Sequence, residues 1–180
     1  MKKLLPSLIM LLSTSSFAGS FGVMTGYYSL NSKSGSKSAT VSALGSYRFF
    51  YHHEIRPNFI ADLSYTVLFE KSLGGDSSYG FDIGGSYFPF QRATSSESQL
   101  DNVTIKIEPK YSPYIGLGYH QRQYQSIRSA YSGPGIKAGT IYSYSKSFNI
   151  IGEARYISLS GPVSTTATEL STNIGVVFKY

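Results

Sequence analysis

The sequence contains no cysteine and no tryptophan, and only 14% of its 180 residues are charged. Without cysteine the chain forms no disulfide, carries no lipid on a cysteine and has no thiolate metal site. After residue 18 no apolar run is long enough for a transmembrane helix, and helical periodicity is absent. A chain of this length without disulfides must be held by its own fold, which indicates a single domain.

The beginning of the chain has the pattern of an export signal. Two lysines precede an apolar stretch, Leu4–Leu12, that is too short to cross a bilayer as a helix. Small side chains follow, as a cleavage site between Ala18 and Gly19 requires. We therefore expect residues 1–18 to be a signal peptide and residues 19–180 to form the exported domain.

The last ten residues, STNIGVVFKY, alternate strictly between two faces of a strand. An exposed strand of this kind is an aggregation hazard unless its edges are paired, as they are in a closed barrel. The apolar and aromatic members of the alternation are Ile174, Val176, Phe178 and Tyr180.

Seven further segments alternate with the same period of two. An even number of strands is typical of single-chain outer-membrane barrels, and a sheet can cross a membrane only if it closes on itself. The sequence therefore predicts an all-β fold, an eight-stranded antiparallel up-and-down transmembrane β-barrel. The expected strands lie at residues 21–30, 39–51, 59–69, 79–87, 115–120, 136–144, 148–156 and 171–180.

Aromatic residues gather at both ends of the expected apolar faces, as two interfacial girdles would. The periplasmic girdle would hold Phe21, Phe49, Tyr51, Phe59, Tyr87, Tyr111, Tyr144, Phe148 and Tyr180. The outer girdle would hold Tyr27 or Tyr28, Phe69, Tyr79, Tyr119 and Tyr156.

The connections mostly fit this topology. Short turns fall on the periplasmic side, around residues 52–57 and 145–147, and the outer connections are rich in Ser, Gly and Thr. One periplasmic connection, residues 90–102, is too long for a turn. The alternation at Val103, Ile105 and Ile107 indicates a hairpin that extends the fifth strand beyond the membrane, with Pro109 and Pro113 marking an edge or a bulge.

The expected outer loops are residues 31–38, 71–78, 122–133 and 159–169. Their cations are available to lipopolysaccharide phosphates, although scattered solvated charges are commoner and nothing clusters densely enough for nucleic acid. These cations are Lys33, Lys37, Lys71, Arg122 and Arg128.

The polar phases of the strands collect three basic and three acidic side chains inside the barrel. Because eight strands leave a lumen that side chains can fill, and because buried charges must be paired, we expect a structural ion network there. A gated pore or an ion-selective path is the alternative interpretation. The six residues are Arg48, Asp62, Asp82, Lys137, Glu153 and Arg155.

Histidine offers little catalytic signal. His120 falls on the inward phase with Glu153 two strands away, an arrangement that could imitate the base and carboxylate of a lipid A-modifying barrel enzyme. No serine at a distinctive spacing accompanies it, so we expect a hydrogen-bonded interior histidine. His52 and His53 lie at an expected turn and lack a third ligand, so we expect neither a metal nor another cofactor.

Several segments resemble the small outer-membrane barrels of the OmpA, OmpX, OmpW and opacity-protein type. They are YSPYIGLGY at 111–119, GIKAGTIYSY at 135–144 and EARY at 153–156, and the terminal IGVVFKY is similar to the signal that the barrel assembly machinery reads. The resemblance implies an outer-membrane location, contact with lipid and lipopolysaccharide, and a monomer. Tyr180 departs from the phenylalanine that usually ends this family.

The expected role is structural or adhesive, exerted through the outer loops. A first alternative is a narrow channel for small hydrophobic molecules, and a second is the lipid A-modifying enzyme. A soluble, lipocalin-like barrel would instead turn its apolar faces inward. The channel would use the apolar residues of the inward phases, Leu44, Ile60, Leu68, Ile141 and Ile151.

Overall fold

The computed structural model describes most of the chain from Gly19 onward, and the expected signal peptide, its cleavage residue Ala18 and the terminal Tyr180 lie outside the described part. The described residues are 19–69, 77–90, 96–100, 103–107, 109–124, 129–145, 147–162 and 164–179.

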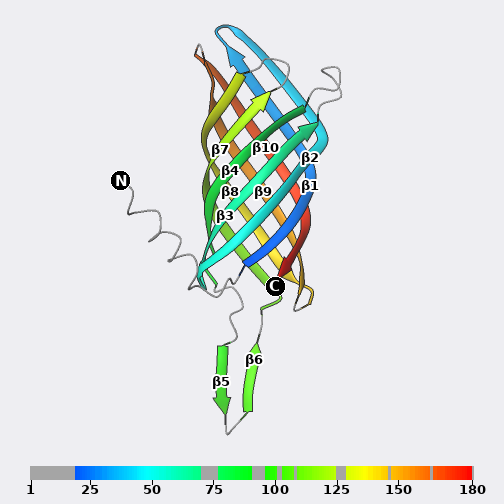
Figure 1. Ribbon diagram of the computed structural model, residues 1–180, viewed down its shortest axis with the longest axis vertical. Coiled ribbons are helices and arrows are strands. Elements are labelled where there is room, and N and C mark those ends of the chain that lie inside the picture. The colour runs from blue at the N-terminus through cyan, green and yellow to red at the C-terminus, as the bar shows by residue number, and fades with distance from the viewer. Residues whose placement is uncertain are drawn as a thin grey trace, which may run out of the picture.

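Eight strands close into a barrel in the order β1-β10-β9-β8-β7-β4-β3-β2, and every neighbouring pair is antiparallel (Figure 1). The prediction of an eight-stranded up-and-down barrel is confirmed. The barrel strands are β1 (Gly19–Ser34), β2 (Lys37–Arg56), β3 (Phe59–Phe69), β4 (Ser77–Tyr87), β7 (Tyr111–Tyr124), β8 (Ser129–Ser143), β9 (Phe148–Ser160) and β10 (Thr165–Lys179).

The first and last strands close the barrel. Their pairing runs without interruption from Ser20 opposite Lys179 to Ser34 opposite Thr165. The ring of Phe178 stacks on Phe21 with centroids 5.4 Å apart, so an aromatic contact lies on the outside of this seam. The alternation of the terminal strand thus forms one wall of a closed sheet whose lower end, as drawn in Figure 1, holds both ends of the barrel chain.

The outer surface of the barrel is apolar and its interior is polar at mid-height, the reverse of a soluble β-barrel. Leu63, Ile83, Leu117 and Ile174 are all more than half exposed, whereas charged side chains are buried. Aromatic residues follow the outside of both ends, and of the two candidates for the outer girdle Tyr27 is exposed whereas Tyr28 points inward. Among the described residues, no helix combines the length and the apolarity needed to cross a membrane. This distribution is what a barrel facing lipid requires.

The strands reach further upward than the sequence pattern suggested. β1 and β2 continue to a tight turn between Ser34 and Lys37, where Gly35 adopts a positive φ of 59°, and β9 and β10 are separated only by residues 161–164. The loops predicted at 31–38, 122–133 and 159–169 are therefore wrong in extent. Above the apolar belt the outward side chains are polar, such as Ser158, Ser160 and Thr166, so the apolar outer face that marks a lipid-facing strand disappears from the sequence.

A β-bulge in β2 corrects one predicted face. The register with β1 shifts between Gly26 and Tyr27, which pair with Ser46 and Leu44 and leave Gly45 unpaired. An extra residue reverses the side-chain alternation beyond it. Leu44 consequently points outward with 83% of its surface exposed, and its predicted inward orientation is wrong.

The long lower connection contains a separate two-stranded hairpin, β5 (Ser96–Leu100) with β6 (Val103–Ile107). It projects below the barrel in Figure 1, as predicted, but it is not a continuation of β7. Pro113 lies near the start of β7. This part of the strand pairs with β8 on one side, but below Ile115 it has no β4 partner on the other side. An edge without a ladder partner is where a strand tolerates proline.

The interior ion layer as the candidate functional site

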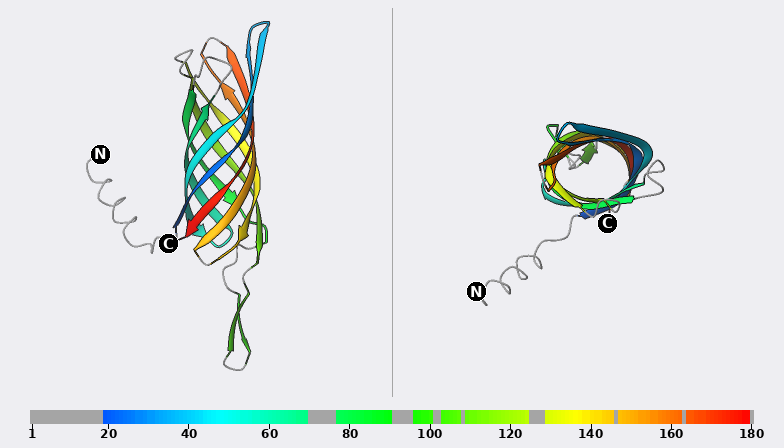
Figure 2. Two further views of the ribbon diagram at one scale, coloured as in Figure 1. Left: turned by 90° about the vertical axis from the view of Figure 1, so that its right-hand side faces the viewer. Right: turned by 90° about the horizontal axis from the view of Figure 1, so that it is seen from above.

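Seen from above in Figure 2, the barrel wall forms a closed ring. Three layers of buried side chains fill its lumen. Along β3, for example, the inward series runs from Ile60 through Asp62, Ser64 and Thr66 to Leu68. The lower apolar layer consists of Met24, Phe50, Ile60, Phe88, Tyr114, Ile141, Ile151 and Val177. The upper apolar layer consists of Tyr28, Leu30, Leu68, Tyr131, Ile157, Leu159 and Ala167. Between them lies the layer of charged residues that we call the ion layer, Arg48, Asp62, Asp82, His120, Arg122, Lys137, Glu153, Arg155 and Glu169.

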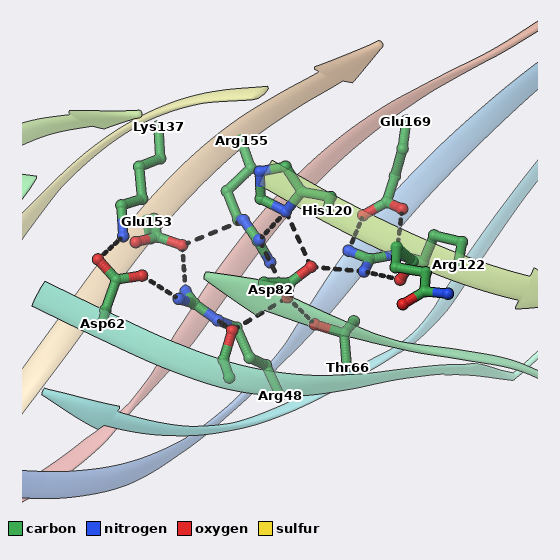
Figure 3. Close-up of polar contacts among 12 residues, drawn as sticks. Arg48, Asp62, Thr66, Asp82, His120, Arg122, Lys137, Glu153, Arg155 and Glu169 are labelled. Carbon is green, nitrogen blue, oxygen red and sulfur yellow. Dashed lines mark hydrogen bonds and ion pairs between the residues drawn. The ribbon is translucent and has the colours of Figure 1, made fainter. Parts of the chain in front are cut away.

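The lower part of the ion layer joins β2, β3, β8 and β9 across the lumen (Figure 3). The Lys137 ammonium donates to Asp62 Oδ2 at 2.6 Å, and Arg48 Nη2 lies 3.5 Å from Asp62 Oδ1. Arg48 also pairs with Glu153, whose other oxygen accepts the Tyr114 hydroxyl at 2.7 Å. Apart from the Arg48–Asp62 pair, whose strands β2 and β3 are neighbours, these contacts join strands that are not neighbours in the sheet, so they brace the barrel from within.

The upper part of the ion layer converges on Asp82. Its Oδ2 accepts the hydroxyls of Thr66 at 2.7 Å and Ser64 at 3.0 Å. Its Oδ1 lies 2.8 Å from His120 Nδ1 and accepts Arg122 Nη1 at 2.5 Å. A fifth group, Arg155 Nη2, is 3.2 Å from Oδ2. A carboxylate with this many donors satisfies nearly all of its acceptor sites without water.

Arg122 and Glu169 complete this layer, although the sequence pattern assigned both to outer loops. Arg122 Nε donates to Glu169 Oε2 at 2.9 Å and Nη2 donates to Oε1 at 3.3 Å, a two-pronged ion pair. Both residues are 0% exposed, so the interpretation of Arg122 as a lipopolysaccharide-facing cation is wrong. The only signal in the sequence was that Arg122 and Glu169 carry opposite charges and fall on the inward phases if the neighbouring strands are extended to include them. Of the other expected surface cations, Lys33 and Lys37 are at the upper hairpin, and Lys71 and Arg128 lie outside the described residues.

The formal charges of the ion layer balance when His120 is neutral. The six residues that the sequence placed inside the barrel are all buried, and the added Arg122 and Glu169 contribute one charge of each sign. Burying a single ion costs several kcal/mol even after relaxation, and pairing plus hydrogen bonds must offset that cost. The layer as a whole is therefore a neutral, interlocked unit in which each ion depends on the others.

Glycines on the inner wall make room for these long side chains. A Cβ added to Gly135 would lie 2.6 Å from His120 Nε2, and one added to Gly118, its cross-strand neighbour, would lie 3.1 Å from the same atom. A Cβ on Gly116 would lie 2.5 Å from the Lys137 side chain. The glycines of the GLG segment in β7 and the PG segment in β8 thus form a flat inner surface, the glycine floor. The imidazole of His120 and the methylene chain of Lys137 lie against it.

The surroundings of His120 do not form a nucleophile–base–carboxylate arrangement. Its Nδ1 contacts Asp82 and also Arg155 Nη2 at 2.9 Å, and in the described chain no serine hydroxyl bonds to it. Ser64, a serine of the same network, donates to Asp82 instead. His52 is buried in β2 rather than placed in a turn, and the described residues contain no group of three His, Cys, Asp or Glu side chains that could hold a metal.

The apolar residues expected to line a channel are packed against one another. Ile60, Ile141 and Ile151 belong to the lower apolar layer and Leu68 to the upper one, all with 2% exposure or less, while Leu44 faces outward. An apolar layer thus lies on each side of the ion layer, and its side chains occupy the positions that a channel would have to keep open.

The fold, the apolar outer surface and the filled lumen together define the class of protein. It is a small outer-membrane-type β-barrel. No protein-family model and no curated protein sequence matches the chain. Among solved structures, Neisserial surface protein A has a TM-score of 0.58 at 17% identity, over 89% of this chain and 97% of that one. A de novo designed transmembrane β-barrel gives 0.48 at 15% identity, over 93% and 98%. The attachment invasion locus protein Ail of Yersinia pestis gives 0.45 at 16% identity, over 89% and 99%. At this level of identity the first likeness supports the barrel fold alone.

Proposed function

We propose that the protein is a non-conducting outer-membrane barrel that anchors a surface-exposed β-hairpin and acts through contacts made by that hairpin. The observation that carries the proposal is the three-layer lumen, in which apolar layers cover the ion layer on both sides. A filled lumen favours a structural and interaction role over transport. The apolar exterior with aromatic rings at both ends supports a location in the outer membrane after export.

The interacting element is the upper extension of β1 and β2 rather than a set of flexible loops. In Figure 2 this hairpin reaches higher than the other strands. Its outer face is polar and internally bonded, with Ser42 donating to Ser29 at 2.9 Å and Asn31 donating to Thr40 at 2.9 Å. Above the exposed Leu44 and Tyr27, therefore, the surface changes from lipid-compatible to water-compatible, which supports a position of the hairpin outside the cell.

Two measurements test this proposal. First, the protein should fractionate with outer membranes, and its electrophoretic mobility should shift on boiling, as for a barrel that stays folded in detergent. Second, a variant in which residues 32–39 are replaced by a two-residue Asn-Gly turn should keep that shift but lose the ability of cells to attach to protein-coated surfaces. Equal attachment by both forms of the protein would remove the interaction role and leave a purely structural one.

The enzymatic alternative has a direct test of its own. His120 is held between Asp82 and Arg155 inside the barrel, out of reach of a lipid headgroup. Overexpression should therefore leave the mass profile of lipid A unchanged. A new lipid A species that disappears in the His120→Ala variant would overturn the non-enzymatic proposal.

A further inference from the structure

The outer part of β2 is paired on one side only. Its residues 37–44 pair with β1, from Lys37 opposite Ser34 to Leu44 opposite Tyr27. On the other side the ladder with β3 begins only at Ser46 opposite Leu68, and no strand of the described chain continues it upward. Eight residues of backbone, about 25 Å of strand at the usual rise, thus present an open sheet edge above the membrane belt.

Below Lys37 at the tip, this edge lacks the features that normally prevent a sheet edge from pairing. In an antiparallel ladder every second residue turns its N–H and C=O toward the same neighbour, so half of the residues offer both groups to the open side. Natural edges are protected by proline, by charged side chains or by bulges. The sequence from Ser38 to Leu44, SATVSAL, contains no proline and no charge, and apart from the exposed Leu44 it has no large side chain. The bulge at Gly45 lies below the edge, and the second register shift of β2, between Glu54 and Arg56, lies at the opposite end of the strand.

A second copy of the chain in the same membrane does not fit this edge. Barrel strands tilt by about 35–45° from the axis, and copies in one membrane are related by rotation about the membrane normal. The two β2 edges would both run toward the membrane and would cross at roughly twice the tilt, about 70–90°. Antiparallel pairing requires nearly opposed directions, so the partner must be a strand free to choose its own direction.

The charges near the tip specify the partner further. Lys33 and Lys37 flank the turn and are exposed, and there is no acidic residue between Gly19 and His53. Because β2 runs from the tip toward the membrane, an antiparallel partner ends with its carboxyl-terminal part at the tip. Acidic residues there would lie beside the two lysines.

We propose that the open edge at residues 37–44 binds an extended peptide segment of a protein outside the cell as an additional antiparallel strand, with acidic residues toward the carboxyl-terminal end of that segment. This inference rests on the proposed function, because it requires the hairpin to lie outside the membrane. Backbone hydrogen bonds supply the affinity and the lysines supply the direction, as in other forms of strand addition.

The free protein provides the first test. In detergent micelles, NMR-detected amide exchange along residues 37–44 should alternate, with residues facing β1 protected and residues facing the open side exchanging rapidly. Protection of both sets would show that another part of the chain already covers the edge, and would overturn the proposal.

Synthetic peptides provide the second test. The probe is a ten-residue peptide of alternating threonine and valine that ends in two aspartates, and it should bind with amide shifts confined to β2 and the tip. Methylating the amide nitrogens that face the ladder should abolish binding, whereas methylating the alternate set should not. Equal binding by both methylated peptides, or shifts elsewhere on the barrel, would contradict strand addition.

Charge reversal at the tip tests the direction. The double variant Lys33→Glu/Lys37→Glu should weaken binding of the aspartate peptide by about tenfold or more and should favour a peptide that ends in two lysines. Lys110→Glu, an exposed cation at the opposite end of the barrel, is the matched control and should change neither affinity. An unaltered preference in the double variant would contradict the proposed orientation.

The outcomes separate this inference from the function on which it rests. If cell attachment depends on the hairpin while neither peptide binds, the hairpin acts through its side chains and the edge proposal fails alone. If attachment does not depend on the hairpin, the proposed function fails, and peptide binding in micelles then describes an edge without a role on the cell surface.

Discussion

The ion layer and the upper part of the β1–β2 hairpin are built from the same strands but are stabilised in opposite ways. At the ion layer every strand has two neighbours and its inward side chains are tied across the lumen. In the upper hairpin β2 has one neighbour among the described strands, and its side chains make exposed local contacts. The comparison indicates that side-chain contacts across the lumen fix the shape of the barrel. The hairpin is held by backbone pairing instead, and its polar groups remain accessible to a partner.

The largest effect should follow from removing one ion of the layer. Arg48→Ala leaves the buried Glu153 and Asp62 without their shared cation, and breaking a buried pair in this way costs about 3–5 kcal/mol. Equilibrium urea unfolding in micelles measures it. Arg56→Ala, on the exposed lower end of the same strand, should leave the unfolding free energy almost unchanged. Equal effects of both substitutions would mean that the ion layer does not brace the barrel.

A substitution in an apolar layer should rank next. Ile60→Ala removes a fully buried side chain from the lower layer, and such truncations cost about 2–5 kcal/mol. Leu63→Ala on the lipid-facing side of the same strand, where the side chain is 53% exposed, should cost clearly less in the same unfolding experiment. If the Leu63 variant were the less stable one, the lumen would not be packed as described.

The glycine floor gives a smaller but site-specific effect. Gly135→Ala would press a methyl group against His120 and the Tyr156 carbonyl, and overpacking of this kind costs about 1–3 kcal/mol. Gly152→Ala meets no atom within 4 Å and is the control. Unfolding curves report the stability, and NMR shifts of the imidazole should move only in the Gly135 variant. If the Gly135→Ala variant left both the unfolding free energy and the imidazole shifts unchanged, the position assigned to His120 would be contradicted.

The smallest effect belongs to the upper hairpin. Ser42→Ala removes an exposed hydrogen bond to Ser29, so the unfolding free energy should change by no more than about 0.5 kcal/mol. The amide exchange pattern of the hairpin should also persist, because backbone pairing with β1 maintains it. Loss of that pattern would show that side chains, rather than the ladder, hold the hairpin.

Much of the barrel could be predicted because one physical rule, a lipid-facing apolar side chain at every second residue, acts along each strand. That rule placed the six ionic residues on the inward phases. It fails where it no longer applies: at Gly45 the bulge reverses the phase, so Leu44 was assigned to the wrong face. Toward the upper end the outward residues are polar, such as Gln121 and Gln123 beside Arg122 and Thr168 beside Glu169, so the strand positions of Arg122 and Glu169 were taken for loops. Which acid meets which base depends on cross-lumen distances that no single strand encodes.

The central claim is that the three layers seal the lumen, and ionic conductance tests it most directly. Purified protein that shows the heat-dependent mobility shift would be reconstituted into planar lipid bilayers in concentrated potassium chloride. The account predicts a membrane current indistinguishable from that of the protein-free bilayer at every applied voltage. Reproducible unitary current steps from the folded protein would contradict it, because they would require a continuous water path through both apolar layers and the ion layer.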